Sequence, residues 1–221
     1  MAAPAAHAGS QRNRVWDLPT RVFHWLLVIN FFVAYLTGDN DRWALIHITC
    51  GYTILGLILF RLVWGFVGTV HARFSSFIRK PSVVLAYLKG LVTLKPQHYS
   101  GHNPAGGWAI VLLLFLGIAT IVTGWAEYEE FEFNGIEQYH QWLANGMLAV
   151  VFLHLAGVLV SSLIHRENLV RAMLDGCKCT CEGSVHHRCS MAVILLLVVS
   201  AYWIWVYRAG LLKTLSLLLP A

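Results

Sequence analysis

Charged residues are scarce in this chain. Asp, Glu, Lys and Arg make up 12% of its 221 residues, while hydrophobic residues make up 57%. A water-soluble domain of this size does not need so much apolar surface. The composition therefore excludes a water-soluble protein. The first twenty residues also lack the apolar centre of a secretory signal peptide. We therefore expect a loose cytoplasmic tail at 1–20 and a first hydrophobic helix that is retained.

Long apolar runs are what the chain has in place of charge. Five of them are long enough, or nearly so, to cross a bilayer as helices. They cover residues 22–37, 44–66, 107–126, 138–164 and 191–207. The sequence thus predicts an all-α integral membrane protein. We expect a four-helix transmembrane bundle at 21–178, a Cys/His-rich cytoplasmic connection at 179–190 and an additional C-terminal transmembrane segment at 191–221.

The charges that do occur alternate between the connections. Lys and Arg precede the first run and fill the second and fourth connections, whereas the first and third connections are acidic. The positive-inside rule then places the N-terminus and both basic connections in the cytoplasm. We expect a multi-pass membrane protein with a cytoplasmic N-terminus. The net charge of +5 follows from this anchoring and gives no reason to expect nucleic-acid binding.

Four histidines fall into two pairs by depth in the membrane. His140 and His154 are fourteen residues apart in one apolar run, which is close to four helical turns and about 21 Å of rise. With the orientation above, His47 lies level with His140 toward the outside. His24 lies level with His154 toward the inside. Ionisable side chains inside a membrane span are costly and suggest a functional site, although any one histidine can also be a packing residue.

The residues missing around these histidines favour haem over other metals. No carboxylate or thiolate completes a tetrahedral zinc site at either level, and the spans contain no Glu-x-x-His pairs of the di-iron type. Gly51, Ala144 and Gly157 follow the histidines closely, and small residues allow a flat macrocycle to approach a helix. Two haem groups, each with two axial imidazoles, are therefore expected. Such irons have no open coordination position, which favours one-electron transfer.

Four segments of the chain resemble the prokaryotic di-haem cytochrome b561 family, which includes the b-type cytochrome subunits of membrane-bound nickel–iron hydrogenases. They are RVFHW at 21–25, IHITCGYTILGLILFRLVWG at 46–65, GHNPAGG at 101–107 and YHQWLANGMLAVVFLHLAGV at 139–158. The resemblance covers roughly residues 14–178. It implies that the axial ligands of two haem b groups are His24, His47, His140 and His154. It also implies electron transfer between the quinone pool and a partner redox protein, in the bacterial cytoplasmic (inner) membrane.

Residues near the predicted haem edges have two possible roles. Arg21, Arg61 and Arg166 would contact haem propionates, or they anchor the helices at the membrane interface. His102 and Asn103 would line a quinone or haem edge, or they build the turn before the third span.

The fourth connection is rich in cysteine. Its members are Cys177, Cys179, Cys181 and Cys189. A metal site is one reading, but C-x-C-x-C lacks the usual spacing of structural zinc sites, so reduced cytoplasmic thiols are favoured. The last apolar run contains no histidine and no acidic residue, so we expect a helix for packing or for docking a partner.

The function expected from these features is electron transfer across the membrane. Seven of the eleven acidic residues lie on the predicted outer face, which would attract a cationic partner such as a basic c-type cytochrome or a periplasmic oxidoreductase subunit, for example of a hydrogenase. One alternative is a stand-alone superoxide:quinone oxidoreductase, although an acidic face repels superoxide. A second is a non-redox membrane scaffold or transporter. Lipid and quinone are the other expected partners, and a homodimer stays open.

Overall fold

Five helices are long and apolar enough to cross a membrane. The computed structural model describes residues 12–93, 97, 99, 101–179 and 189–218. The spanning helices are α1 (Leu18–Thr37), α2 (Ala44–Val67), α5 (Pro104–Tyr128), α6 (Ile136–His165) and α8 (Cys189–Leu218). The prediction of an all-α membrane protein with five spans is confirmed, because each helix contains the apolar run from which it was predicted.

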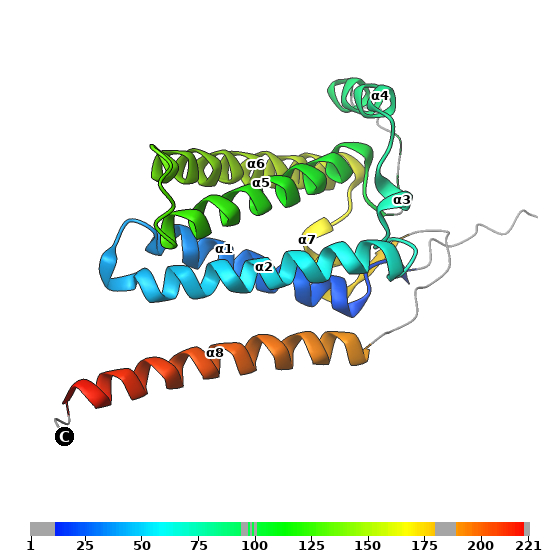
Figure 1. The fold of residues 1–221 in the computed structure, drawn as a ribbon. Helices are drawn as coiled ribbons and strands as arrows, with labels where there is room; N and C mark the ends of the chain where they lie inside the picture. Colours follow the sequence, from blue (N-terminus) through cyan, green and yellow to red (C-terminus); the bar gives the residue numbers. More distant parts are fainter. Residues whose placement is uncertain (1–11, 94–96, 98, 100, 180–188, 219–221) are drawn as a thin grey trace, which may run out of the picture.

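The spanning helices form two antiparallel hairpins and a separate fifth helix. In Figure 1 the α5–α6 hairpin lies on one side of the α1–α2 hairpin, and α8 lies along the other side. A buried apolar cluster joins the two hairpins, with members from all four helices. These members are Phe31, Ile54, Ile58, Leu114 and Met147. The four-helix bundle therefore shares one core.

Capping residues explain where two of the spans begin. The Asp17 carboxylate accepts a hydrogen bond from the Thr20 backbone N–H at 2.9 Å and so caps α1. Asn103 caps α5 through a 2.7 Å bond from the N–H of Gly106. Both caps satisfy donors that the first helical turn leaves free. Gly135 precedes α6 with a φ of 84°, a left-handed conformation in which glycine is unstrained.

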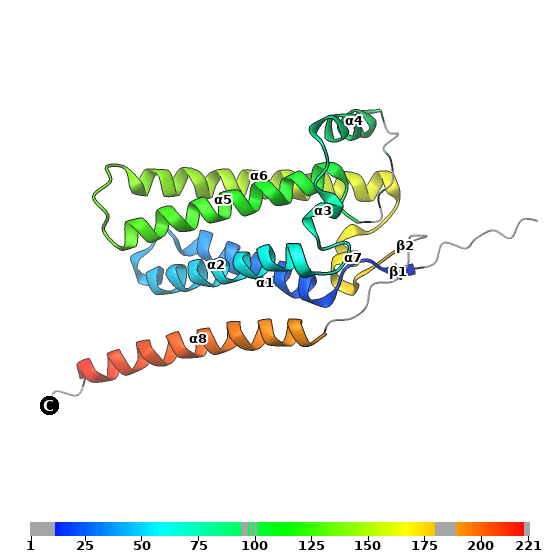
Figure 2. The same cartoon turned by 45° about the vertical axis from the view of Figure 1, so that its right-hand side comes forward.

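Short elements gather at one end of the bundle. They are α3 (Phe74–Phe77), α4 (Pro81–Val92), α7 (Leu169–Asp175) and the strands β1 (Arg12–Arg14) and β2 (Cys177–Cys179), while a single 3₁₀ turn (Asp41–Trp43) precedes α2 at the other end. Figure 2 shows α4 beside the end of the α5–α6 hairpin, at the same end as α7 and the strands. By the predicted orientation this is the cytoplasmic end.

The expectation of a loose tail at 1–20 is wrong for residues 12–20. Strand β1 pairs antiparallel with β2, and the backbone N–H groups of Val15 and Trp16 donate to the Gly176 carbonyl at 2.8 and 3.0 Å. Val15 and Trp16 are buried against Ala172. Three-residue strands leave no periodic signal in a sequence, so only the partner segment reveals them. Residues 180–188, most of the predicted Cys/His-rich connection, lie outside the described residues.

Helix α8 packs on the α1–α2 hairpin. Its Leu195 is buried with Phe23 and Leu57, and the Trp203 indole N–H donates to the Thr53 hydroxyl at 3.1 Å. These contacts agree with the expected packing role. A role in docking a partner stays a prediction.

Candidate functional site

His47 and His140 meet between the two hairpins. Their ring centres are 6.0 Å apart and the ring planes are inclined by 78°. Both rings line a cavity of about 120 Å³ whose walls come from α1, α2, α5 and α6. The structure therefore brings together the two histidines that the sequence assigns to the outer level.

Backbone carbonyls hold both of these imidazoles. The Nδ1 atom of His47 lies 2.9 Å from the Ala34 carbonyl oxygen of α1. The Nδ1 atom of His140 lies 2.9 Å from the Thr120 carbonyl oxygen of α5. Since a carbonyl oxygen can only accept, Nδ1 carries the proton in each ring and Nε2 keeps its lone pair. This is the arrangement that orients a histidine for metal coordination through Nε2.

Two glycines of α5 line this cavity, and one of them gives the His140 ring its space. A Cβ atom at Gly124 would lie 2.7 Å from Cε1 of His140, so the imidazole sits directly against the helix backbone. Gly117 also lines the cavity, and a Cβ there would lie 2.8 Å from Ile58. The sequence reasoning missed both. Their spacing of seven residues, two helical turns on one face, was the available signal.

His24 and His154 are close enough to interact electrostatically. His24 lies on α1, and its ring makes an edge contact with Trp25 at 5.2 Å. Its Nδ1 atom is buried and has no hydrogen-bond partner among the described residues. The imidazole of His24 is thus held differently from those of His47 and His140, and its pairing with His154 stays a prediction.

Arg61 is the most buried of the three predicted propionate contacts, with 2% of its surface exposed. Its guanidinium lies 4.9 Å from the ring centre of Phe74 and 5.7 Å from that of Phe77. The Nη1 atom has no hydrogen-bond partner within the described part of the chain. In contrast, Arg21 donates to the Leu174 carbonyl, and Arg166 is exposed at the C-terminus of α6.

His102 is enclosed near Arg61 at the end of the bundle that holds α7 and the two strands. Its ring centre is 4.4 Å from that of Trp16 and 4.8 Å from that of Phe77. Burial lowers the pKa of His102 well below its usual range, and the nearby positive charges of Arg61 and Lys178 act in the same direction. Its neighbour Asn103 caps α5, which supports the prediction that this residue builds the turn before that helix.

The cysteine residues do not form a metal site in the part of the chain that the structure describes. Cys177 and Cys189 are free thiols there, and no group of three or more His, Cys, Asp or Glu side chains in the described ranges is placed to hold a metal ion. Cys181 lies outside the described residues, and of Cys179 only the backbone is described. Metal binding by the four cysteines of this connection therefore stays an untested prediction.

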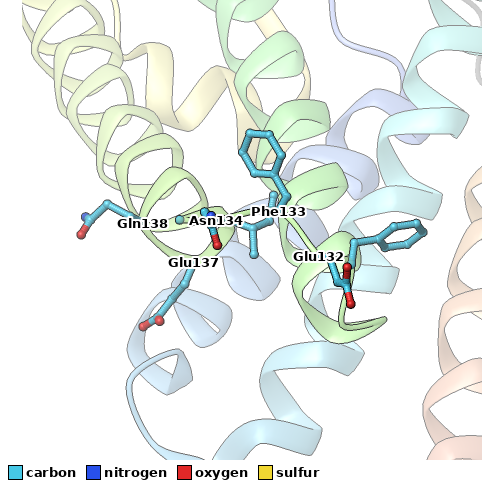
Figure 3. Close-up of a pocket in the computed structure, with 8 residues that line it drawn as sticks. Glu132, Phe133, Asn134, Glu137 and Gln138 are labelled. Carbon is cyan, nitrogen blue, oxygen red and sulfur yellow. The ribbon is translucent and has the colours of Figure 1, made fainter.

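The acidic outer connection is close to the cavity. Figure 3 shows the α5–α6 loop, in which Glu132 and Glu137 point to different sides. Residues 131–138 surround a shallow hollow. Trp125 lines the cavity that holds His140, and its ring centre is 5.4 Å from that of Phe131 in the loop. An aromatic contact thus connects the cavity wall with the acidic loop.

Sequence comparison identifies the family to which this arrangement belongs. The sequence model of the family described as prokaryotic cytochrome b561 matches residues 15–176. The chain belongs to this family. The resemblance seen in the sequence is confirmed, and the multi-pass membrane fold agrees with it. All four paired histidines lie inside the matched region of this cytochrome b561, whereas α8 lies outside it.

Several relatives are similar over most of the chain. A probable Ni/Fe-hydrogenase B-type cytochrome subunit of Bradyrhizobium diazoefficiens is 27% identical, over 80% of this chain and 92% of its own length. The corresponding protein of Rhodobacter capsulatus is 25% identical over 73% of this chain and 79% of its own length. A probable Ni/Fe-hydrogenase 1 B-type cytochrome subunit of Escherichia coli K12 is 22% identical over 65% and 75%. No solved structure matches.

Proposed function

We propose that this cytochrome b561 carries two haem b groups and transfers electrons across the inner membrane between the quinone pool and a redox partner protein. The observation that carries this proposal is the pair His47 and His140, whose rings lie 6.0 Å apart with each Nδ1 bonded to a carbonyl. Two imidazoles so prepared on facing helices are an axial ligand set.

The residues of the outer site fit a haem. Metal–nitrogen bonds of about 2.0–2.1 Å on both sides of one ion place two ring centres about 6 Å apart, which agrees with the observed separation. A Cβ atom at Gly51, in the cavity wall, would have open space around it. Haem b, when bound with two axial histidines, supplies one-electron chemistry.

The inner site would use His24 and His154 as ligands. The unpaired Nη1 of Arg61 is a suitable donor for a haem propionate, because a buried guanidinium favours a carboxylate partner. Arg21 and Arg166 are weaker candidates, since one already donates to a carbonyl and the other is exposed. The buried Nδ1 atom of His102 has no hydrogen-bond partner among the described residues and would be available to a quinone at this end of the bundle.

The outer loop would receive the redox partner. The names of the relatives indicate a nickel–iron hydrogenase as one such partner. The acidic loop supports a partner with a cationic surface, which includes basic c-type cytochromes. The cytoplasmic N-terminus follows from the alternation of basic and acidic connections.

A reduced-minus-oxidised spectrum and a haem-to-protein ratio on the purified protein test the proposal. We expect a b-type α band and about two haems per chain, as two bis-histidine sites require. A preparation without a b-type band, from cells that supply haem, would contradict the proposal and favour a non-redox scaffold. Rapid superoxide oxidation with quinone and without a protein partner would favour the stand-alone oxidoreductase.

A further inference from the structure

The two predicted haem sites differ in the hydrogen bonds made by their histidines. From this difference we infer that the backbone carbonyls of Thr120 and Ala34 hold the reduction potential of the outer haem below that of the inner haem. Gly124 is the positioning residue that makes the His140 bond to Thr120 possible. This inference rests on the proposed di-haem function.

Both outer imidazoles donate from Nδ1 to a carbonyl at 2.9 Å. Such a bond withdraws the proton partly from the ring, so the imidazole becomes more basic and donates more electron density through Nε2. A more strongly donating ligand stabilises the oxidised, more positive iron. Hydrogen bonding of this kind around the axial ligands is one of the levers that lower a haem potential.

At the inner site at least one predicted ligand lacks this hydrogen bond to a carbonyl. The Nδ1 atom of His24 is buried without a hydrogen-bond partner among the described residues. Its imidazole is therefore the weaker donor, and the oxidised state of an iron bound there is stabilised less. The potentials are then ordered so that an electron entering from the outer face moves downhill to the inner level.

Surface charge acts in the same direction, but with less effect. Seven carboxylates on the outer loops would also favour the oxidised state of the outer haem. The five glutamates and two aspartates are exposed, and salt screens exposed charges over about 8–10 Å. We therefore assign the main difference to the hydrogen bonds inside the bundle.

Gly124 controls the geometry of the hydrogen bond between His140 and the Thr120 carbonyl. A Cβ atom at this position would lie 2.7 Å from Cε1 and 3.0 Å from Nδ1 of His140. Both distances are too short for a real methyl group, so the imidazole would move away from α5. The 2.9 Å bond to the Thr120 carbonyl would lengthen or break. The Thr123 hydroxyl, at 3.4 Å from the same Nδ1, is a longer and weaker partner than the Thr120 carbonyl.

The test is a redox titration of the purified holoprotein and the Gly124→Ala variant, followed at the haem α bands. We expect one midpoint potential to rise, by a threefold to tenfold change in the equilibrium constant, where tenfold is 59 mV for a one-electron couple. The second potential should stay unchanged. Electron paramagnetic resonance of the oxidised protein should show a shifted signal for the same haem.

Two further variants complete the test, one as a second displacement of a ligand and one as a control. A Cβ at Gly38 would already be in van der Waals contact with His47, 3.4 Å from Cε1 and 3.5 Å from Nδ1, so the two further methyl groups of Gly38→Val should displace that ring and raise the same potential. Gly146→Ala on α6 is the matched control, because its Cβ would meet nothing within 4 Å. If Gly124→Ala loses its outer haem, the potentials of Gly38→Val decide between the outcomes.

The inference is overturned if variants that retain both haems have the same two potentials as Gly146→Ala, or if the potential that rises is that of the inner haem. A parent protein without two haems would instead contradict the proposed function. The two failures are therefore distinguishable in one set of preparations.

Discussion

The imidazoles of His47 and His140 face each other across the boundary between the two helix hairpins, with ring centres 6.0 Å apart. Each ring is hydrogen-bonded to a helix other than its own: His47 to α1 and His140 to α5. All four helices of the bundle therefore contribute to one pair of side chains. A change in the packing of either hairpin would alter the distance between the two rings.

Replacing single histidines should remove different haems. His140→Ala and His47→Ala should each lose the outer haem, whereas His154→Ala and His24→Ala should lose the inner one, because one imidazole cannot supply both axial bonds. The haem-to-protein ratio should fall from about two to about one in every variant. Difference spectra of the four variants should then form two matching pairs. Full haem retention in all four would rule out these ligands.

Arg61 should affect the inner haem alone. The Arg61→Gln variant removes a buried cation that lies over Phe74 and Phe77, so a propionate there would lose its charge-assisted donor. We expect the Arg61→Gln variant to lose its inner haem more readily during purification. Arg61→Lys keeps the positive charge and should retain more of the inner haem than Arg61→Gln. Arg79→Gln, at an exposed position that is not a predicted propionate contact, is the matched control. Equal haem loss in the Gln variants of Arg61 and Arg79 would argue against the propionate role.

Asp17 should be needed for stability. Its carboxylate caps α1 through Thr20 and accepts hydrogen bonds from the Trp64 indole at 3.1 Å and the Thr69 hydroxyl at 2.6 Å. Asp17→Ala leaves these buried donors unpaired and should lower the free energy of unfolding by about 3 kcal/mol. Thermal unfolding in detergent measures the effect. The exposed Asp39→Ala should change it by less than about 0.5 kcal/mol.

His102 should make the protein less stable in mild acid. Burial holds its pKa in the folded protein well below the value of about 6.5 in the unfolded chain. Below pH 6.5 the unfolded chain therefore binds more protons at this site, and stability falls as the pH falls, by up to about 1.4 kcal/mol per pH unit. Above pH 6.5 this contribution to the stability of the folded protein is fully present. His102→Gln should remove this part of the slope between pH 7.5 and 5, measured as thermal stability. Parallel pH profiles of parent and variant would contradict the prediction.

The acidic loop should accelerate encounter with a cationic partner. Changing Glu127, Glu129 and Glu132 to Gln should slow electron exchange with a basic c-type cytochrome by about tenfold at low ionic strength, because electrostatic steering is reduced. The difference should disappear at high salt. Stopped-flow kinetics over a salt series measures this, with Lys89→Gln at the opposite end of the bundle as the control. A rate that does not depend on salt in the parent would exclude docking by charge.

Some features of the site were predictable because they depend on length and period alone. Five apolar runs were enough to predict five spans, and alternating charge placed His47 level with His140. The contact between Gly124 and His140 was not predictable in the same way. It depends on how closely α5 approaches α6, which is a property of two helices together. The same holds for Arg14 in β1, whose strand partner lies more than 160 residues away.

The sequence by itself determined that this chain spans a membrane, how many spans it has and at which levels its histidines lie, because hydrophobic length and helical rise are local properties. Only the tertiary structure decided which atoms hold those histidines. The carbonyls of Ala34 and Thr120 become available to His47 and His140 only where neighbouring helices pack, and the Nδ1 of His24 has no such carbonyl within the described chain. That difference arises from packing between helices, and no pattern within a single helix encodes it.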